Sequence, residues 1–534
     1  MSRCKINVCI RLLKELYGEL PSKVGYYLMT TGPSSLKVIS FDTKLTLTQT
    51  KKVLWILIQQ NIVTFDQSKR SGLEYTIDTD HVLWRLRFPK YIYCAKALYG
   101  DAAELLVEEL LHEGQGVIGN VVQKVTDKLN EALETAGHTR IQSSLVRDKF
   151  SSLVRTHFLQ RCPNPVRDAK QRVISLENPA QSETLFVLPL MDVDDVSTSK
   201  RKRSVDDSTQ PIKKIKTEGS SSVQDDVVYW RINFERFHQH FRDQAIIDAV
   251  SKKIDKKASE IVRTMLRLSE VKTDPFAEVT LPLSFTEIFQ SLSKDHGMTK
   301  LVLDQYLSII SDDSAGFITK VGESGGGMFV VNMLKVLTAL CTAHVESVVQ
   351  ERFGSKCLRI FRVLLLKKQI EQKQIEDYAM IPAKEAKEML YSLLEENFIT
   401  FTEVSKTVDH APSRTYYLFN VHLIHVTRML LEHTYKAAAN AMVRREMEVN
   451  EHKRLLDKQE RVEAIISTLE QDDETQKEEI EQMITPPERV QLEKVKVAVN
   501  KLDNCEIQLD DTIFLLETYL AYTMKPPPVK PSKT

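Results

Sequence analysis

The sequence predicts a mainly helical protein with small β-hairpins that ends in a long pair of helices. Three observations predict this fold class. The 17 glycines and 18 prolines are few for 534 residues, and so low a share of chain breakers favours helices and short turns. A helix-plus-hairpin pattern recurs along the chain. An apolar heptad pattern occupies its last part. Hydrophobic residues make up 42% of the chain and charged residues 27%, which is enough for packed cores in three or four domains.

Two matching segments give the clearest sign of repeated units. Residues 52–65 and 388–401 share a helical spacing of apolar residues, then an asparagine, then a β-prone run. Asn61 and Asn397 suit the left-handed conformation in which many helices end. Looser copies of the pattern lie at residues 150–159 and 303–310, the second followed by a β-prone run at 317–321.

A hairpin is expected after each of these helices. In three places a polar or glycine-rich turn is followed by a second β-prone run, as at residues 66–77. Helices that lead into a helix-plus-hairpin describe a winged helix, in which the hairpin is the wing. We therefore expect four tandem extended winged-helix domains, at residues 1–85, 86–165, 228–340 and 341–435.

Residues 166–227 are expected to form a flexible linker. Serine, aspartate, lysine, proline and threonine dominate this segment, which leaves few apolar groups to bury. Two basic clusters within it have the spacing of a bipartite nuclear import signal, although a solvated charge run is the alternative. The clusters are Lys200, Arg201, Lys202 and Arg203, and then Lys213, Lys214 and Lys216.

The C-terminal part of the chain predicts an antiparallel coiled-coil hairpin at residues 436–525, followed by a disordered tail at 526–534. Apolar residues recur every three or four positions from Leu492 to Leu520, and the pattern breaks only where Glu506 occupies the expected core position. A shorter apolar stripe precedes it. Thr485, followed by two prolines, marks the start of a new helix between the stripes, which favours a hairpin over one long helix.

No motif indicates catalysis, and we expect no catalytic residue, no metal and no cofactor. Gly114–Gly119 matches a dinucleotide-binding pattern by letter, but it follows a helical stretch and is expected to be a turn. Ser324 matches a nucleophile-elbow pattern, but a β-prone run follows it, which predicts a hairpin tip. His238 and His240 lack further ligands at metal-binding spacing. The seven cysteines are scattered, as expected of free thiols in a reducing compartment.

The first predicted domain has a charge pattern that suits nucleic acid. Residues 1–100 contain 15 Lys or Arg and 7 Asp or Glu, whereas the whole chain is neutral, which counts against a uniformly basic coat protein. Phosphate contacts and base stacking are expected of basic and aromatic side chains on one exposed surface. The candidate contacts are Lys52, Trp55 and Gln59 on the helix, beside Thr48, and Lys69 and Arg70 on the wing.

Two alternatives to nucleic-acid binding remain open at this stage. Aromatic and basic residues also mark protein interfaces, so Trp55 suits a protein partner equally well. Residues 85–93 form a second basic and aromatic segment, which we interpret as a packed connector more readily than as a nucleic-acid track.

In the fourth domain, the positions that match the helix of the first domain hold Lys384, Glu388, Tyr391 and Glu395. Two carboxylates there favour a protein contact.

Several segments closely resemble the family of the third subunit of nuclear RNA polymerase III. They are residues 237–244, 260–266, 348–354, 381–387, 409–414 and 511–517. The resemblance covers nearly the whole chain outside the expected linker. That family has four extended winged helices and a C-terminal coiled coil, and it is similar in kind to the alpha subunit of general transcription factor IIE.

The resemblance implies a non-catalytic subunit of DNA-dependent RNA polymerase III. Such a subunit forms a detachable trimer with two smaller subunits, sits near the clamp of the polymerase core and contacts the polymerase III initiation factor. The trimer serves promoter-directed initiation by opening or holding melted, single-stranded DNA, for transfer RNA, 5S ribosomal RNA and other short transcripts. A role in sensing cytosolic DNA in innate immunity is also implied. We therefore expect a nuclear protein with a second location in the cytoplasm and no membrane partner.

The alternative function is a sequence-specific DNA-binding regulator built from tandem winged helices. It predicts several basic recognition helices, and both the neutral total charge and the acidic fourth helix count against it.

Overall fold

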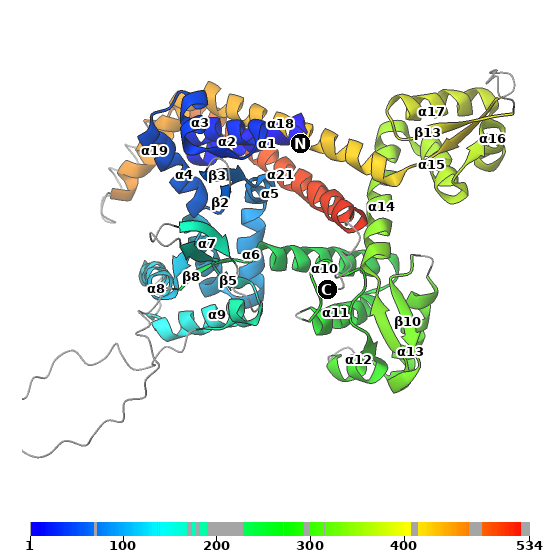
Figure 1. The fold of residues 1–534 in the computed structure, drawn as a ribbon, viewed down its shortest axis with the longest axis horizontal. Coiled ribbons are helices and arrows are strands. Elements are labelled where there is room, and N and C mark those ends of the chain that lie inside the picture. The colour runs from blue at the N-terminus through cyan, green and yellow to red at the C-terminus, as the bar shows by residue number, and fades with distance from the viewer. Residues whose placement is uncertain are drawn as a thin grey trace, which may run out of the picture. The chain divides into compact units, whose positions relative to one another are not determined.

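The computed structural model describes residues 2–68, 72–135, 137, 139–167, 173–177, 182–188, 228–270, 272–292, 298–313, 315–406, 415–468 and 483–524. The chain divides into two compact units, and Figure 1 shows the helices and strands of both. The first unit contains Met1–Thr30, Thr79–Arg87 and His238–Thr534, and the second contains Thr31–Asp78 and Phe88–Phe237. Among the described helices, none is both long enough and apolar enough to cross a bilayer.

One order of elements recurs along the chain: a helix, a short strand, two helices and two further strands. The first occurrence is α2 (Glu19–Thr31), β1 (Ser34–Ser35), α3 (Leu36–Thr43), α4 (Leu47–Gln59), β2 (Val63–Ser68) and β3 (Gly72–Ile77). The second is α7 (Asp101–Glu113), β4 (Gly116–Val117), α8 (Ile118–Thr135), α9 (Ser143–Arg155), β5 (Leu159–Arg161) and β8 (Tyr229–Ile232).

The later part of the chain follows the same order twice more. The third occurrence is α11 (Lys256–Ser269), β9 (Leu283–Ser284), α12 (Phe285–Ser291), α13 (Lys300–Asp312), β10 (Ile318–Gly322) and β11 (Met328–Val331). The fourth is α15 (Ser355–Lys367), β12 (Ile370–Glu371), α16 (Gln372–Ala379), α17 (Ala383–Glu395), β13 (Thr400–Ser405) and β14 (Thr415–Asn420). In all four, the last strand lies in the middle of a three-stranded antiparallel sheet.

Further helices precede or connect these groups. They are α1 (Arg3–Tyr17), α5 (Thr79–Leu83), the 3₁₀ helix η1 (Trp84–Arg87), α6 (Phe88–Tyr99), α10 (Phe234–Lys253) and α14 (Met333–Phe353). The two enzyme-like patterns lie in turns, as expected. Gly114 follows the end of α7, and Ser324 begins the short 3₁₀ helix η4 (Ser324–Gly326) between β10 and β11.

The helix stop predicted from the sequence repeat is confirmed. Asn61 and Asn397 have φ angles of 55° and 60°. Each donates its backbone N–H to the carbonyl three residues back, and the next residue donates to the carbonyl five residues back. His157 makes the same pair of bonds after α9 with φ 67°. Because this pattern satisfies carbonyls that the helix leaves unpaired, the three helices α4, α9 and α17 all end in the same way.

The second sheet includes a strand from beyond the expected linker, so the second domain does not end at residue 165 as expected. Its central strand β8 lies beyond the expected linker and pairs with β4 and β5, with Trp230 opposite both Gly116 and Arg161. The Trp230 side chain is fully buried and meets Phe150 edge-on, with 5.7 Å between ring centroids. Burial of this ring in the second core explains why the strand belongs there.

The expected linker of residues 166–227 thus separates two neighbouring strands of one sheet. It also contains part of a β-hairpin, because β6 (Asn164–Arg167) pairs antiparallel with β7 (Val173–Glu177). A short 3₁₀ helix, η2 (Ser182–Phe186), follows. The two basic clusters at 200–203 and 213–216 lie outside the described residues, as do Lys69 and Arg70 of the first wing and the tail at 526–534.

In the second compact unit, the end of α4 is docked on the turn between α7 and β4. The side chains of Gln59, Gln60 and Asn61 donate hydrogen bonds to the carbonyls of Glu113, His112 and Gly114, at 3.1, 2.7 and 3.1 Å. These bonds satisfy carbonyls at the exposed end of α7. A side chain at Gly114 would collide with the backbone, because a Cβ atom there would lie 2.3 Å from the Gln59 carbonyl oxygen.

The C-terminal arm is an antiparallel helical hairpin, as predicted. It consists of α18 (Leu423–Glu451), α19 (Lys453–Thr468) and α21 (Pro486–Thr523), and Figure 1 shows α18 and α21 side by side. The side-chain contacts show that α21 runs antiparallel to α18 and α19, because the partner's residue number falls as the number on α18 and α19 rises. The contacts are Arg428 with Met524, Tyr435 with Glu517, Arg445 with Glu506, and Lys458 with Glu488. The arm begins at Leu423, earlier than the expected boundary at residue 436, because α18 starts directly after β14.

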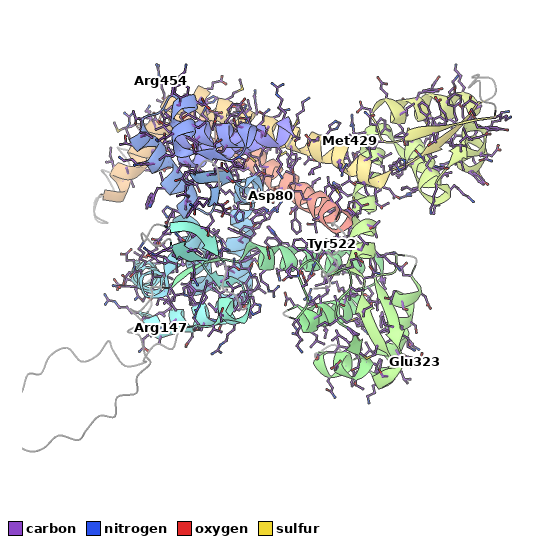
Figure 2. All side chains as sticks on the ribbon, in the orientation of Figure 1. Asp80, Arg147, Glu323, Met429, Arg454 and Tyr522 are labelled. Atoms are coloured by element: carbon purple, nitrogen blue, oxygen red, sulfur yellow. The ribbon has the colours of Figure 1, made fainter. Side chains whose placement is uncertain are left out.

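The last turns of α21 belong to two cores. Leu516 and Tyr519 pack into the core of the fourth group of elements, and Tyr522 packs into that of the third. The Tyr522 hydroxyl, labelled in Figure 2, donates to the Pro275 carbonyl and accepts from Arg242, both at 2.6 Å. The arm is therefore continuous with both neighbouring cores and is not a free-standing coiled coil.

Glu506 occupies a buried position in the seam of the arm, as the heptad pattern predicted. Its side chain is 8% exposed and accepts a hydrogen bond from Arg445 at 3.1 Å through Oε2. Arg445 also pairs with Glu15 and Asp503. Burial raises the pKa of the Glu506 carboxyl to about 7, against a partial lowering by Arg445. At neutral pH the arm therefore holds a carboxylate that burial disfavours.

We predict that Glu506→Gln stabilises the arm at neutral and alkaline pH. The pKa of Glu506 is higher in the folded protein than in the unfolded chain, so between these two pKa values the folded state binds more protons. The free energy of unfolding of the wild type therefore falls as pH rises from about 4.5 to 7. The amide removes this loss, which amounts to at most about 3 kcal/mol. Thermal unfolding at pH 5 and pH 8 checks the expectation. Asp503→Asn is the matched control, because it removes an Arg445 partner that is 42% exposed; an equal pH-dependent gain in that variant would contradict the explanation.

We predict that Gly114→Ala releases the end of α4 from the α7–β4 turn. Gly100→Ala is the control, since both glycines have positive φ, 79° and 90°, but nothing lies within 4 Å of a Cβ at Gly100. The sparsely populated backbone conformation alone costs on the order of 1–3 kcal/mol in each variant, whereas overpacking adds about 1–3 kcal/mol at Gly114 alone. Hydrogen exchange of the backbone amides of residues 57–62 should accelerate only in Gly114→Ala, and equal exchange in the two variants would refute the docking role.

Candidate functional site

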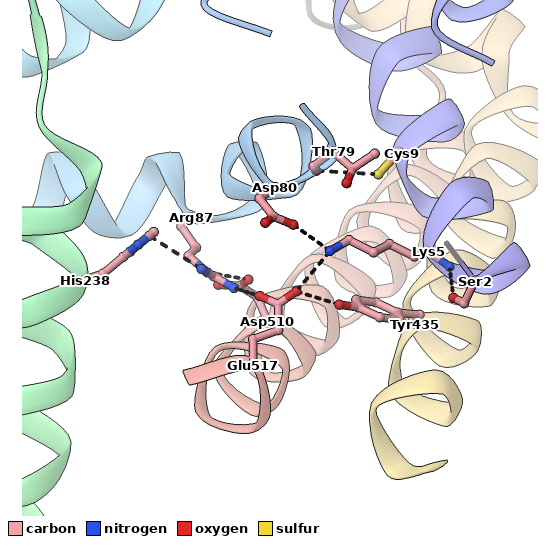
Figure 3. A network of polar contacts seen from close by, with 10 residues as sticks. All are labelled: Ser2, Lys5, Cys9, Thr79, Asp80, Arg87, His238, Tyr435, Asp510 and Glu517. Carbon is pink, nitrogen blue, oxygen red and sulfur yellow. Dashed lines mark hydrogen bonds and ion pairs between the residues drawn. The ribbon is translucent and has the colours of Figure 1, made fainter. Parts of the chain in front are cut away.

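A buried ion pair connects η1 with the last helix of the chain. Arg87 Nε donates to the Asp510 carboxylate at 2.8 Å, and its Nη2 lies 3.3 Å from a Glu517 oxygen (Figure 3). The Arg87 and Asp510 side chains are 3% and 1% exposed. The guanidinium also lies over the Phe514 ring, 5.1 Å from its centroid. Because a charge removed from water needs a partner, each member of this pair requires the other.

The same network extends to the first helix of the chain. Lys5 of α1 contacts Asp80 at 2.6 Å and Glu517 at 3.6 Å, and the Tyr435 hydroxyl of α18 donates to Glu517 at 2.5 Å (Figure 3). Burial alone would lower the Lys5 pKa, but Glu517 and Asp80 raise it overall. Burial and the Glu517 carboxylate both raise the Tyr435 pKa. The network thus holds Lys5 as a cation and Tyr435 as a neutral donor.

The network settles two of the sequence-based alternatives. Arg85 and Arg87 are only 7% and 2% exposed, so this part of the segment 85–93 is a packed connector. His238 is a packed histidine, because its ring meets Trp84 edge-on, with 4.8 Å between centroids, and lies beside Arg87. Burial, Arg87 and His81 together hold the His238 pKa well below its usual value.

A different group of residues comes near to metal-binding spacing. Potential ligand atoms of Glu448, Glu451 and His452 lie within 4.8 Å of one another at the end of α18, among the described residues. Glu448 is also paired with Arg444. Exposed acidic groups of this kind are common without a metal, so the group does not alter the expectation of a protein without metal.

The surface of α4 presents the candidate contacts with nucleic acid. The helix begins at a capping box between Thr46 and Gln49, which fixes the turn before Lys52. Lys52 is exposed, and the Trp55 side chain is 67% exposed. Gln59 points to the α7–β4 turn and is bonded to Glu113 and Gln115. The structure therefore leaves Lys52 and Trp55 accessible and uses Gln59 within the protein.

A hollow of about 580 Å³ lies beside Trp55, between α4 and the helices α7 and α8. Its charged lining is mixed: Lys124 pairs with Glu113, and Lys128 pairs with Glu109 at 2.6 Å. A hydrogen bond from Lys128 is the main cause that lowers the pKa of Glu109. Because these lysines are already paired with carboxylates, Lys52 is the more accessible cation beside the exposed indole.

The corresponding surface of α17 has the opposite character. Glu388 and Glu395 are exposed, as is Lys384, and Tyr391 is 51% exposed at the position of Trp55. Glu388 thus replaces Lys52 on a helix that ends in the same way. The contrast predicted from the sequence is present in the structure as a basic surface on α4 and an acidic one on α17.

Arg87, Asp510 and Glu517 were not predicted from the sequence as one group. Arg87 is more than four hundred residues from its partners, so no local pattern could pair them. A signal was nevertheless present, because Asp510 and Glu517 follow Glu506 at helical spacing on the otherwise apolar side of α21. Acidic residues that interrupt an apolar seam predict buried cationic partners.

Comparison with known proteins identifies the family. Family models match residues 148–340 (RNA polymerase III subunit RPC82), 345–421 (POLR3C, C-terminal winged-helix domain), 454–515 (DNA-directed RNA polymerase III subunit RPC3, helical hairpin domain) and 7–68 (RNA polymerase III subunit RPC82 helix-turn-helix domain).

Relatives match over almost the full length of this chain. DNA-directed RNA polymerase III subunit RPC3 of Bos taurus is 49% identical over 545 residues, and that of Homo sapiens is 48% identical over 545 residues. Each alignment covers 98% of this chain and 100% of the relative. The Danio rerio subunit is 46% identical, with 98% and 99% covered. The chain therefore belongs to the RPC3 family of DNA-directed RNA polymerase III subunits.

Proposed function

We propose that this subunit helps RNA polymerase III to open promoter DNA or to hold it melted during initiation. It does so as a non-catalytic member of a detachable trimer with two smaller polymerase III subunits, near the clamp and in contact with the initiation factor. The transcripts served are transfer RNA, 5S ribosomal RNA and other short RNAs. Its location is the nucleus, with import through the basic clusters at 200–203 and 213–216.

In this function, the four recurring groups of elements act as four tandem extended winged helices with different roles. DNA contact is assigned to the first winged helix because Lys52 and Trp55 are both exposed on its helix α4. A phosphate would meet Lys52, and an unpaired base would stack on Trp55. Lys69 and Arg70 on the wing would add further phosphate contacts.

Such contacts are sufficient to oppose reannealing of melted strands. A strand whose base is stacked on an indole and whose phosphate is neutralised has to lose both contacts before it can pair again. No readout of base edges is needed, so the binding is independent of sequence. This fits initiation at many different promoters better than it fits a regulator of particular sequences.

Attachment to the polymerase falls to the arm and the fourth winged helix. The acidic surface around Glu388 and Glu395 would repel a phosphate backbone. The arm is rigidly joined to the same core through Leu516 and Tyr519. A rigid body that carries an acidic surface suits a protein partner, whereas the basic α4 suits DNA.

We predict that Trp55→Ala and Lys52→Glu weaken binding of the full-length chain to a fluorescein-labelled oligothymidine. Loss of one stacked base costs about 1–3 kcal/mol, so the Kd should rise by about tenfold in Trp55→Ala. Loss of one phosphate contact should also reduce the slope of log K against log salt by about 0.7 in Lys52→Glu. Fluorescence anisotropy at several salt concentrations measures both quantities.

Matched controls come from α17. Tyr391→Ala and Lys384→Glu make the same changes on the corresponding helix and should leave oligothymidine binding unchanged. Binding by Trp55→Ala that equals the wild type would remove the stacking role. If that variant instead fails to co-purify with the polymerase, the α4 surface is a protein interface.

A further inference from the structure

The fourth winged helix contains an aromatic groove between α16, α17 and its sheet. The groove has a volume of about 690 Å³, within the range of sites that bind ligands. We use the name aromatic groove for the hollow lined by Tyr391, Leu394, Phe401, Tyr416, Tyr417 and Phe419.

Four of the five rings of the aromatic groove are open to solvent, and the fifth, Phe419, is buried. Tyr391, Phe401, Tyr416 and Tyr417 are 51%, 44%, 41% and 39% exposed. Phe401 meets Tyr417 edge-on, with 5.9 Å between centroids. Several large apolar rings that share one concave surface cost free energy while they face water, so such a surface marks a site that binds another molecule.

Strand pairing brings rings from both wing strands to one face of the sheet. Phe401 lies opposite Phe419, and Glu403 lies opposite Tyr417. Side chains two residues apart on a strand share a face, so Phe401, Glu403, Tyr417 and Phe419 line up along the sheet. Tyr391 and Leu394 of α17 form the opposite wall. The groove therefore has a floor of rings with a carboxylate in the same row.

The charge around the groove selects its occupant. Residues 371–406 contain eight carboxylates and four lysines, and Glu371 and Glu376 line the groove together with Lys373. A surplus of carboxylates repels nucleic acid and attracts a basic segment of protein. Tyrosine adds a hydroxyl that can donate to the carbonyls of an extended peptide, whereas its ring packs on proline or aliphatic side chains.

We propose that the aromatic groove binds a basic, proline-containing segment of a partner protein in an extended conformation. A polyproline II segment has no internal hydrogen bonds, so its carbonyls are free to accept from tyrosine hydroxyls. Lysine or arginine residues that flank the prolines would meet Glu371, Glu376 and Glu403. This proposal deepens the protein-contact role proposed above for the fourth winged helix.

The test uses a labelled peptide with this chemistry and the full-length chain. The probe has the sequence of residues 525–533, which contains four prolines and three lysines. Fluorescence anisotropy should show saturable binding that weakens with salt. Tyr391→Ala and Tyr417→Ala should each raise the Kd about tenfold, and Glu376→Lys should raise it and flatten the salt dependence. A peptide with alanine in place of each proline should bind at least about tenfold more weakly.

The control variant is Tyr378→Ala. Tyr378 is 54% exposed on α16 and lies under Lys367 at 4.9 Å, and it does not line the groove. Peptide binding should be unchanged in this variant. Equal affinity of Tyr391→Ala and Tyr378→Ala for the probe would overturn the proposal, as would displacement of the probe by oligothymidine.

Two further outcomes distinguish other occupants. If removal of residues 525–534 from the chain raises its affinity for the probe more than about fivefold, the chain's own C-terminal segment occupies the groove and the assignment to a partner is overturned. Failure of the peptide test leaves oligothymidine binding by Trp55 untouched. The failure of either proposal can therefore be recognised separately.

Discussion

The Arg87–Asp510 ion pair is the interaction on which the first compact unit depends. It joins the connector that follows the first wing to the last helix, and Glu517 carries the connection on to Lys5 and Tyr435. Removing both charges from water is costly, and a buried pair of this kind adds little net stability compared with apolar residues. Its value lies in specificity, since any other register of α21 against α1 and η1 would leave a buried charge without a partner. Chain segments from the two ends of the sequence are thereby held in one arrangement.

The same arrangement joins the arm to two further cores of the first compact unit. The final turns of α21 pack into the cores of the third and fourth groups of elements through Leu516, Tyr519 and Tyr522. The arm is thus the common axis of the first compact unit, and the acidic α17 with its aromatic groove is built on the same body.

Local patterns predicted much of the fold, because local physical chemistry decides it. Asn61 and Asn397 indicated helix ends, because asparagine tolerates positive φ. Glu506 indicated a buried position between the helices of the arm, because it replaces an apolar residue in the heptad pattern. Pairings between distant segments could not be predicted in this way. Trp230 follows a long polar segment that gave no sign of the strand beyond it. Arg87 lay in a stretch that was interpreted as a packed connector, but nothing in that stretch indicated its partner on α21. Among the candidate nucleic-acid contacts, the exposure of Lys52 and Trp55 could be predicted from helical periodicity. The hydrogen bonds of Gln59 to the α7–β4 turn could not, because only the tertiary structure brings that turn to the end of α4.

Hydrogen exchange in Asp510→Asn tests the central role of the ion pair most directly. The amide keeps the shape of the carboxylate but removes the nearer and more deeply buried of the two negative charges that face the Arg87 guanidinium, so that only Glu517 at 3.3 Å remains. Exchange should accelerate both in residues 506–520 of α21 and in residues 79–87 of the connector, whereas Glu493→Gln, an exposed change on the same helix, should alter neither. Acceleration in α21 alone, or none beyond that of the control, would show that the connector and the last helix are held together by other contacts and would contradict the account.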